Sequence, residues 1–481
     1  MSTFHIVNFG CRATQADAAA IERQLVERGF RRAAAAASAD VVVVNTCTVT
    51  QDADAVARQA IRHAHRENPV ARILVTGCYA QRAPEELAQI DGVSWVVGNS
   101  HRPEIPNLVG QASGPASDTH GDFVHIALRE KERSGQAWTL QTPAILTSDP
   151  SVVFGDVVQG SAALGGHTRP VLKIQDGCNH RCAYCVIPFV RGRSRSLEPA
   201  AVVEEIRRLV TGGAKEVVLS GINLGSYGRD LAQRVEFADV VRRILDETQL
   251  ERLRISSIEP MDVTRDLVEL FASSARIARH FHIPLQSGSD RVLAAMHRWY
   301  RAAHYARRVE LIRERVPGAA IGADVIAGFP GETEEDHRAT LRLIEELPFT
   351  YLHVFAFSKR PGTAAANMGG EVTPQVIKQR SRELRALAAE KSAAFRAAHV
   401  GVRLHVLALN RQEEISRRDA EARKKFNSPS VQGLKSEVPA WTEALSDNYL
   451  KVRVAGAWPA NMMLDVRIAA DAGPHLIAQP V

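Results

Sequence analysis

The sequence predicts an α/β protein with an N-terminal doubly wound parallel sheet, an incomplete (β/α)6 barrel and a small C-terminal β-barrel. Short apolar runs alternate with helical stretches near the N-terminus and again after Pro170, as is typical of parallel sheets. After a long polar helix at residues 373–399, the pattern changes to short strands alone. The chain has 481 residues, more than one hydrophobic core usually supports, so several domains are expected.

The N-terminal domain is expected to span residues 1–110. Its expected strands are Phe4 to Phe9, Val41 to Asn45, Arg72 to Thr76 and Ser94 to Val97, and its expected helices are Asp17 to Arg28 and Asp52 to Glu67. The periodicity then fails, and Gly, Ser, Pro and Asp are scattered through residues 111–167. We interpret that segment as a linker with room for one strand pair, because a packed domain seldom holds so long an irregular stretch.

Residues 168–399 are expected to form the barrel domain, which places its chemistry at the C-terminal ends of its strands. The expected strands are Val171 to Gln175, Glu216 to Ser220, Arg252 to Ser256, His280 to Ile283, Ala320 to Val325 and Tyr351 to Ala356. The expected helices between them are Ala200 to Thr211, Val235 to Glu247, Met261 to Ser273, Asp290 to Met296, Ala302 to Val316 and Glu334 to Leu347.

Residues 400–475 are expected to form the small barrel, which we predict to be antiparallel. Its expected strands are Arg403 to Leu409, Tyr449 to Val454 and Met463 to Ile468. The charged stretch Arg411 to Lys435 interrupts them and is interpreted as a solvated insertion or a helix.

Composition is that of an ordinary globular protein, with 45% hydrophobic and 24% charged residues. The formal net charge is +6, and most of the basic residues are arginines, which slightly favours a nucleic-acid partner. The sequence shows no secretory or transmembrane segment, so a cytoplasmic protein without a membrane partner is expected.

The most informative residues are six cysteines in two groups of three. Cys178, Cys182 and Cys185 have the spacing C-x3-C-x2-C in a polar loop, and three such thiolates leave one iron of a cluster open. Structural zinc is disfavoured because no second C-x2-C pair completes such a site. Disulfides are disfavoured because nothing indicates secretion. An iron–sulfur cluster is the favoured interpretation.

The second group is looser. Cys11, Cys47 and Cys78 each follow a short apolar run that is expected to be a strand. Neighbouring parallel strands that end together would bring the three thiols to one edge of a sheet. The sequence therefore predicts a second three-cysteine site, although an isolated cysteine is more often a small buried apolar residue.

With Tyr184 directly before its third cysteine, the tight triplet resembles the radical S-adenosylmethionine superfamily. Nearly the whole chain is similar to its methylthiotransferases, which add a second three-cysteine cluster and end in a small barrel called TRAM. The stretches that carry this resemblance, most of all to the branch acting on threonylcarbamoyladenosine in tRNA, are Asn45 to Thr50, Val75 to Gln81, Leu219 to Asp230, Ile255 to Pro260, His282 to Asp290 and Ala323 to Asp336.

The resemblance implies two 4Fe-4S clusters and S-adenosylmethionine as cofactors. The tight-triplet cluster would reduce S-adenosylmethionine to methionine and a 5'-deoxyadenosyl radical, which takes hydrogen from carbon 2 of the modified adenine beside the anticodon. The loose-triplet cluster would hold or supply sulfur at its open iron, and a second S-adenosylmethionine would give the methyl group. An electron donor of flavodoxin or ferredoxin type and a monomeric state are expected.

Further site residues follow from position. Tyr184 and Ile187 are expected to pack the cofactor adenine, and the backbone of Gly221 is expected to bind its amino group. The polar groups expected at strand ends near the cofactor are Glu259, Gln286 and Glu332, for which helix or loop capping is the competing role. The expected tRNA contacts are Arg191, Arg193 and Arg195 after the cysteine loop, and Lys451 and Arg453 in the TRAM-like barrel.

The chain departs from the family pattern near the first cysteine. The family usually has Asn three residues after it and Glu six residues after it, where this chain has Thr14 and Asp17. The surroundings of the second cluster are therefore expected to differ. The linker and the insertion also look longer than usual.

Three other functions stay open. Sibling methylthiotransferases act on isopentenyladenosine in tRNA or on a ribosomal-protein aspartate. A non-catalytic iron–sulfur carrier is a third alternative, although a carrier would not need a six-stranded barrel with polar strand ends.

Overall fold

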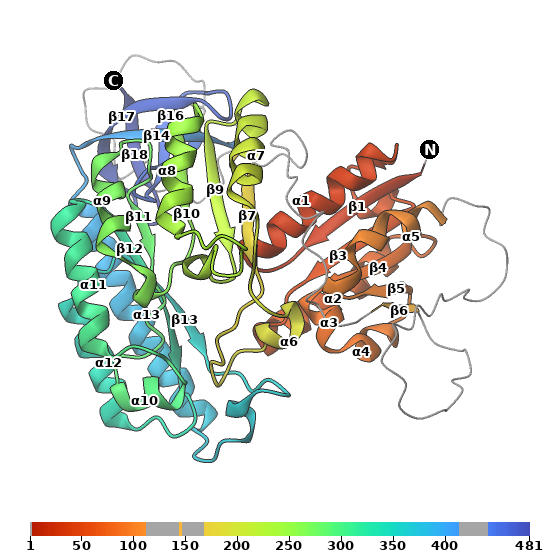
Figure 1. The fold of residues 1–481 in the computed structure, drawn as a ribbon, viewed down its shortest axis with the longest axis horizontal. Helices are drawn as coiled ribbons and strands as arrows, with labels where there is room; N and C mark the ends of the chain where they lie inside the picture. The colour runs from red at the N-terminus through yellow and green to blue at the C-terminus, as the bar shows by residue number, and fades with distance from the viewer. Residues whose placement is uncertain (1, 112–143, 147–167, 413–440) are drawn as a thin grey trace, which may run out of the picture.

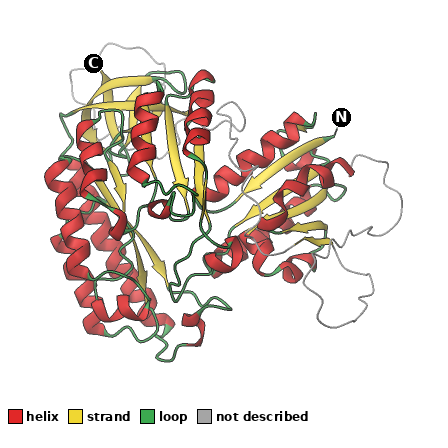
Figure 2. Ribbon diagram, viewed as in Figure 1, coloured by secondary structure: helices red, strands yellow, loops and turns green. Residues whose placement is uncertain are grey.

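The computed structural model describes residues 2–111, 144–146, 168–412 and 441–481, and Figure 1 shows how they are arranged. The N-terminal domain lies to one side of the large barrel domain, and the C-terminal barrel sits against the large barrel. Figure 2 shows the helices on the outside of the large barrel and on both faces of the N-terminal sheet. The predicted fold class is confirmed.

The N-terminal domain is a six-stranded parallel sheet with the strand order β2-β1-β3-β4-β5-β6. The strands are β1 (Thr3–Asn8), β2 (Arg31–Arg32), β3 (Val41–Thr46), β4 (Arg72–Gly77), β5 (Val93–Val97) and β6 (Ala144–Leu146). The order reverses between β1 and β3, and open α/β sheets bind their ligands at such a point.

Helices cover both faces of this sheet, each over its own apolar core. The helices are α1 (Arg12–Glu27), α2 (Gln51–Glu67), α3 (Cys78–Arg82), α4 (Pro84–Ala88) and α5 (Ile105–Gln111), with short 3-10 turns η1 (Ala36–Ser38) and η2 (Asn99–Glu104). Ile21 of α1 and Leu108 of α5 share a core with Phe4, whereas Ile61 of α2 packs with Val42 on the other face. Helix α1 begins at Arg12, five residues before the predicted start, and Cys11 is the residue directly before its first turn.

The second domain is the incomplete parallel barrel, with neighbouring strands in the order β7, β9, β10, β11, β12 and β13. The strands are β7 (Val171–Asp176), β9 (Glu216–Gly221), β10 (Arg252–Ile255), β11 (His280–His282), β12 (Ala320–Ala327) and β13 (Tyr351–Ala356). Isolated bridges, including Ser257 to His282, join β10 to β11. Strand β8 (Arg195–Ser196) pairs antiparallel with β7 at the other edge.

Helices enclose this barrel on its outer side and build the largest apolar core of the described residues. They are α7 (Pro199–Thr211), α8 (Phe237–Glu247), α9 (Arg265–Ser273), α10 (Asp290–Ala295), α11 (Ala302–Arg315) and α12 (Glu334–Glu346). The short helix α6 (Ile187–Arg191) lies apart from them, beside the N-terminal domain (Figure 1). Short turns η4 (Leu224–Ser226), η5 (Pro260–Asp262) and η6 (Ala364–Asn367) complete the set.

After α13 (Pro374–Ala397), the chain forms a closed five-stranded barrel in the order β14-β15-β16-β18-β17. Its strands are β14 (Arg403–Gln412), β15 (Trp441–Ser446), β16 (Lys451–Ala455), β17 (Met463–Asp471) and β18 (Leu476–Pro480). Strands β15 and β18 were not predicted, and β16 pairs parallel with β18, so the barrel is not wholly antiparallel. Most of the predicted insertion, Arg411 to Lys435, lies outside the described residues, as does most of the predicted linker.

The C-terminal barrel closes the N-terminal end of the large barrel. Arg252 donates to the His405 carbonyl at 3.0 Å, and Arg254 donates to the Ser446 carbonyl at 2.9 Å. The Tyr449 ring stacks on His280, with 4.2 Å between ring centroids. Because β10 and β11 begin at Arg252 and His280, this seat lies opposite the strand ends that carry the cysteines. Among the described residues, no helix has the length and apolar character needed to cross a membrane.

Candidate iron–sulfur and cofactor site

The loose cysteine triplet lies at the C-terminal edge of the N-terminal sheet, at its switch point. Cys11 follows β1, Cys47 follows β3 and Cys78 begins α3 directly after β4. The three strands are neighbours in the sheet, and Asn8 is in register with Asn45, which is in register with Thr76. These three residues therefore lie side by side on neighbouring strands, and Cys11, Cys47 and Cys78 follow them by three, two and two residues.

Two glycines allow these loops to approach one another. Gly10 has φ +111°, and a Cβ atom there would lie 2.6 Å from Cys47 Cβ. Gly77 has φ +99°, and a Cβ atom there would lie 2.3 Å from the Thr46 carbonyl oxygen. Any larger residue would force the Cys11 and Cys78 loops away from the Cys47 loop.

The chemistry of this donor set fits a metal cluster. Cys47 and Cys78 are buried and Cys11 is exposed, so the site is open on one side. The pKa of Cys47 is raised to about 12, mainly by burial and in addition by the nearby thiols of Cys78 and Cys11. Three thiols packed in this way ionise together only when a cation compensates their charge, and metal binding therefore releases protons.

The tight triplet lies in the loop after β7, at the C-terminal end of the large barrel. Its turns are held by the backbone: Cys178 N donates to the Gly192 carbonyl and Cys185 N to the Cys182 carbonyl, both at 3.0 Å. His180 N points at Cys178 Sγ from 3.4 Å. Burial raises the pKa of Cys185 to about 12, with contributions from Cys182 and Cys178. These three thiols form a second compact donor set.

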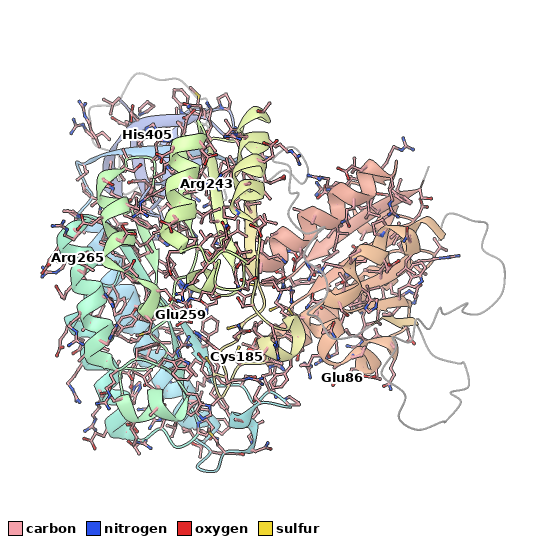
Figure 3. All side chains as sticks on the ribbon, viewed as in Figure 1. Glu86, Cys185, Arg243, Glu259, Arg265 and His405 are labelled. Carbon is pink, nitrogen blue, oxygen red and sulfur yellow. The ribbon has the colours of Figure 1, made fainter. Side chains whose placement is uncertain are left out.

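Arg298 is a site residue that sequence reasoning missed. It donates to Cys182 Sγ at 3.2 Å and pairs with Glu259, with only 4% of its side chain exposed. Figure 3 labels Glu259 on the large barrel and Cys185 in the loop between that barrel and the N-terminal domain. The cation lies next to the thiols, where it would compensate part of a bound cluster's negative charge. Its position just after α10 gave no signal in the sequence.

Gln175 also went unnoticed, because it is the fifth residue of a predicted strand. Its Nε2 donates to the Gly177 carbonyl at 2.8 Å and to Ser194 Oγ at 2.9 Å, which fixes the start of the cysteine loop. Its Oε1 accepts from Asn223 N at 2.7 Å and would lie 3.0 Å from a Cβ atom at Gly221. The backbone of Gly221 therefore lies beside the cysteine loop, where it was expected.

The other expected cofactor residues lie in different settings. Tyr184 packs against a small core that contains Met296 and Phe329. Ile187 packs against Cys78 and Val190 and so lies toward the second triplet. Gln286 is 8% exposed, has φ +63° and lies four residues after the end of β11, where it forms an isolated bridge with Val325 of β12.

Glu332 has a structural explanation. Its Oε2 accepts from Gly328 N at 2.7 Å and from Arg380 at 2.8 Å, and the residue is buried. These bonds fix the turn after β12 against α13. The capping role that competed with cofactor binding accounts for this residue, and we do not include it in the proposed cofactor site.

A cluster of imidazole and carboxylate groups lines the inner face of the barrel and was not predicted. Asp324 Oδ1 lies 3.2 Å from both His282 Nε2 and His353 Nδ1, and the three ligand atoms lie within 4.8 Å of one another. Ser257 Oγ contacts His282 Nδ1 at 2.7 Å. His282, Asp324 and His353 come from β11, β12 and β13. They lie together because of the register of these strands, which the sequence does not show.

The expected tRNA contacts need one correction. Arg191 is 1% exposed and forms ion pairs with Asp17 at 2.8 Å and with Asp176 at 3.0 Å, so its guanidinium is not available to phosphate. Arg193 is exposed, whereas Arg195 is half-buried and donates to the Arg191 carbonyl at 3.0 Å. In the C-terminal barrel Lys451 is exposed and Arg453 is half-buried.

Comparisons with known proteins agree with this arrangement. A family model described as an uncharacterized protein family, UPF0004, matches residues 3–98, and the radical SAM superfamily model matches residues 172–344. The chain is 18% identical to the radical S-adenosylmethionine methyltransferase TsrM from Kitasatospora setae, with a TM-score of 0.53 over 74% of this chain and 73% of that one. At that identity the likeness concerns the fold alone.

Curated relatives are more similar in sequence. The threonylcarbamoyladenosine tRNA methylthiotransferase MtaB of Bacillus subtilis is 39% identical over 80% of each chain, and that of Aquifex aeolicus is 34% identical over 83% of this chain and 91% of the relative. The tRNA-2-methylthio-N(6)-dimethylallyladenosine synthase of Thermobifida fusca is 34% identical over 86% and 80%. With both cysteine sets in place on these two domains, the chain belongs to the radical S-adenosylmethionine tRNA methylthiotransferase family.

Proposed function

We propose that the protein is a tRNA-modifying enzyme that adds a methylthio group to carbon 2 of N6-threonylcarbamoyladenosine beside the anticodon. One observation carries the proposal: two three-cysteine sets, each at the C-terminal ends of parallel strands, lie on the two sides of one domain interface. A short apolar contact joins the two sets. Cys185 ends the tight triplet, and Val186 and Val190, which follow it, pack directly on Cys78 of the other set.

The residues present fit two 4Fe-4S clusters. When bound, a cluster held by three thiolates keeps one iron open, where it supplies either electron transfer to the sulfonium of S-adenosylmethionine or a binding position for sulfur. The relatives named above carry names that state a methylthio transfer to tRNA adenosine. We assign Cys178, Cys182 and Cys185 to the cofactor-cleaving cluster and Cys11, Cys47 and Cys78 to the sulfur-carrying one.

The chain's own groups would position the reactants. Tyr184 and the Gly221 backbone flank the cysteine loop, and Gln286 and Glu259 lie at neighbouring strand ends. Arg298 holds Glu259 in place and adds positive charge beside Cys182. Because Val186 and Val190 pack against Cys78 at the interface, water is excluded from that side of the Cys78 thiol.

The choice of branch rests on the relatives. A relative named for threonylcarbamoyladenosine is 39% identical to the chain, and one named for dimethylallyladenosine is 36% identical.

The exposed Arg193 and Lys451 are the basic residues that we assign to tRNA phosphate. The electron donor of flavodoxin or ferredoxin type, the monomeric state and the cytoplasmic location stay predictions.

Mass spectrometry of tRNA nucleosides from a strain without the gene tests the reaction. We expect the 2-methylthio derivative of threonylcarbamoyladenosine to disappear, to return with the wild-type gene and to stay absent with Cys47→Ala. Loss of the dimethylallyladenosine derivative instead would assign the sibling branch. An unchanged nucleoside profile would favour a protein substrate or a carrier.

Iron content tests the two-site assignment. Anaerobically reconstituted protein should hold about eight irons, four per cluster, and the triple change of Cys178, Cys182 and Cys185 to Ala should leave about four. The Cys47→Ala variant should still cleave S-adenosylmethionine, since the tight triplet is intact. A triple variant that keeps about eight irons would rule out the assignment.

A further inference from the structure

Five charged side chains are buried together where the N-terminal domain meets the barrel. They are Asp17 of α1, Arg102 of η2, Lys173 and Asp176 of β7, and Arg191 at the end of α6. Their exposed fractions lie between 0% and 6%. Two carboxylates and three cations therefore share one water-poor space, and we call these five residues the interdomain charge network.

Each carboxylate of the network uses both of its oxygens. Asp17 Oδ1 accepts from Lys173 Nζ at 2.5 Å and Asp17 Oδ2 from Arg191 at 2.8 Å, while Arg102 also pairs with Asp17. Asp176 Oδ2 accepts from Lys173 at 2.6 Å and Asp176 Oδ1 from Arg191 at 3.0 Å. Lys173 and Arg191 each contact both carboxylates. Asp17 belongs to the N-terminal domain and Asp176 to the barrel, so the two cations bridge the domains.

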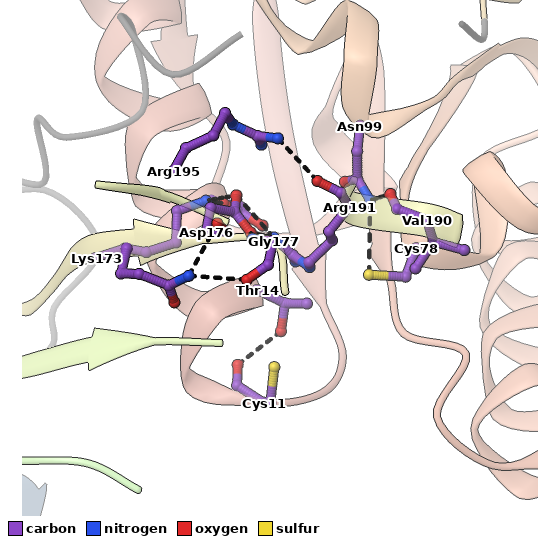
Figure 4. A network of polar contacts seen from close by, with 12 residues as sticks. Cys11, Thr14, Cys78, Asn99, Lys173, Asp176, Gly177, Val190, Arg191 and Arg195 are labelled. Carbon is purple, nitrogen blue, oxygen red and sulfur yellow. Dashed lines mark hydrogen bonds and ion pairs between the residues drawn. The ribbon is translucent and has the colours of Figure 1, made fainter. Parts of the chain in front are cut away.

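The network reaches the loops of both cysteine sets, and Figure 4 shows its contacts toward Gly177 and toward Asn99 and Cys78. On the barrel side, Asp176 Oδ1 accepts from Gly177 N at 2.9 Å, one residue before Cys178. On the other side, Arg102 donates to Asn99 at 2.8 Å, and Asn99 Nδ2 lies 3.6 Å from Cys78 Sγ.

Asn99 also connects the N-terminal domain to the barrel domain. The same Nδ2 atom donates to the Val190 carbonyl at 2.8 Å, in the helix that follows Cys185. Thr14, one turn before Asp17 on α1, donates to the Cys11 carbonyl at 2.7 Å. Short polar contacts therefore connect the loops of both triplets through a single buried cluster.

Stability alone does not explain such an arrangement. Removing several charges from water is costly, and apolar residues of similar volume often serve stability as well or better. Charged groups with fixed hydrogen-bond directions differ from an apolar contact in one respect: they allow only one alignment of the two surfaces. The network carries an excess of one positive charge, and its Arg191 interacts electrostatically with Cys78 and Cys11.

We propose that the interdomain charge network fixes the separation of the two clusters and that Arg191 raises the reduction potential of the cluster on Cys11, Cys47 and Cys78. The proposal rests on the two-cluster function above and makes Asp17 and Arg191 positioning residues. Reduction adds negative charge to a cluster, so a buried cation nearby favours the reduced state and a nearby carboxylate disfavours it.

Three variants and a matched control test it in the reconstituted holoenzyme. Asp17→Asn and Arg191→Met remove charges of opposite sign, and Arg191→Lys keeps the charge but loses the two-armed contact. Glu216→Gln is the control, because Glu216 is also fully buried, pairs with Arg254 at 2.7 Å and has its pKa lowered to about 2, but it lies at the first residue of β9, the strand end away from the cysteines.

We expect opposite shifts in the potential measured by redox titration with electron paramagnetic resonance. For the cluster on Cys11, Cys47 and Cys78, Arg191→Met should lower the potential and Asp17→Asn should raise it, while Arg191→Lys and Glu216→Gln should leave it nearly unchanged. In Arg191→Lys and Asp17→Asn, the two clusters should no longer be held at one separation, so the distribution of dipolar couplings between the reduced clusters should broaden. The ratio of cofactor cleaved to product formed should rise at least about tenfold in both, since small misplacements are costly.

The outcomes separate this proposal from the proposed function. A wild-type protein with one cluster or none would remove the two-cluster function itself. Two clusters in every variant, with potentials and coupling that match wild type, would overturn the role of the network. If Arg191→Met does not fold, Asp17→Asn against Glu216→Gln still decides, because a structural defect alone gives no upward shift that is specific to one cluster.

Discussion

At the scale of single residues, burial separates two arginines of one basic run. Arg191 is 1% exposed and pairs with Asp17 at 2.8 Å, whereas Arg193 is exposed. Because Asp17 lies 174 positions away from Arg191, no local pattern distinguishes the two arginines. The cysteines were predictable for the opposite reason: the spacing of the tight triplet is local, and each cysteine of the loose triplet follows a recognisable strand.

The pKa of Cys47 leads to a prediction for the cluster-free protein. Because burial and two nearby thiols raise that pKa to about 12, Cys47 is almost entirely protonated at neutral pH and should alkylate slowly. The exposed Cys11 should react first. Peptide mass spectrometry after iodoacetamide treatment should show a Cys47 rate that still rises about tenfold per pH unit between pH 8 and pH 10.

Unfolded protein provides the control for this labelling. In urea, Cys47 and Cys11 should react at similar rates, because burial is lost. Equal rates in the folded protein would mean that the Cys47 side chain is accessible, contrary to its 5% exposure.

At the scale of elements, most parallel strands were predicted because buried strands are continuous apolar runs. Strands β15 and β18 were missed for the opposite reason. Trp441–Ser446 is short and partly polar, and Leu476–Pro480 ends in proline, so neither has the apolar run that marks a central strand. Their pairing comes from closure of the barrel, in which β15 pairs with β14 and β16, and β18 pairs with β16 and β17.

Strand β13 presents an aromatic row to the interior of the large barrel. Tyr351, His353 and Phe355 alternate with Leu352 and Val354, which pack into the core, so the three rings share the other face. Ring centroids are 5.3 Å apart for Tyr351 and His353 and 6.5 Å for His353 and Phe355. Phe355 is 38% exposed at the strand end that lies on the cysteine side.

We expect Phe355→Ala to weaken binding of substrate tRNA by about 1–3 kcal/mol, the usual contribution of one base stacked on an aromatic ring. Binding is measured by filter retention or fluorescence with threonylcarbamoylated tRNA. Val70→Ala, at a 90% exposed position of the N-terminal domain, is the control. Cofactor cleavage without tRNA should persist, and unchanged affinity would show that the aromatic row does not face the substrate.

At the scale of the whole molecule, polar contacts connect the three domains at several places. The interdomain charge network is one of them, and it joins the N-terminal sheet to the cysteine side of the large barrel. The C-terminal barrel is held by Arg12 of α1, which donates to the Tyr449 hydroxyl at 3.1 Å, and by Arg254, which donates to the Asp447 carbonyl at 2.9 Å. The sequence predicts three domains but not these contacts, since each one pairs residues from different domains.

The seat of the C-terminal barrel changes how its function is tested. Removing residues 401–481 would leave Arg252 and Arg254 without backbone acceptors and would uncover His280, so the truncated protein should lose stability as well as tRNA affinity. Asn448 and Tyr449 are turned toward the large barrel, where Asn448 Nδ2 donates to the Gly318 carbonyl at 3.2 Å. A surface change is therefore the cleaner test of tRNA binding.

Lys451→Ala should weaken tRNA binding without an effect on cofactor cleavage. Lys451 is exposed at the start of β16, outside the contacts that seat the barrel, and a contact to phosphate should show in the salt dependence. The slope of log affinity against log salt should fall by roughly one unit relative to wild type, and unmodified and threonylcarbamoylated tRNA should lose affinity equally, because phosphate carries no base identity. Arg243→Ala on the outer helix α8 is the control, since its side chain pairs within its own helix with Glu247 at 2.6 Å. If Lys451→Ala keeps the wild-type slope while Arg193→Ala loses it, the tRNA backbone lies against the loop after the tight cysteine triplet and not against the C-terminal barrel.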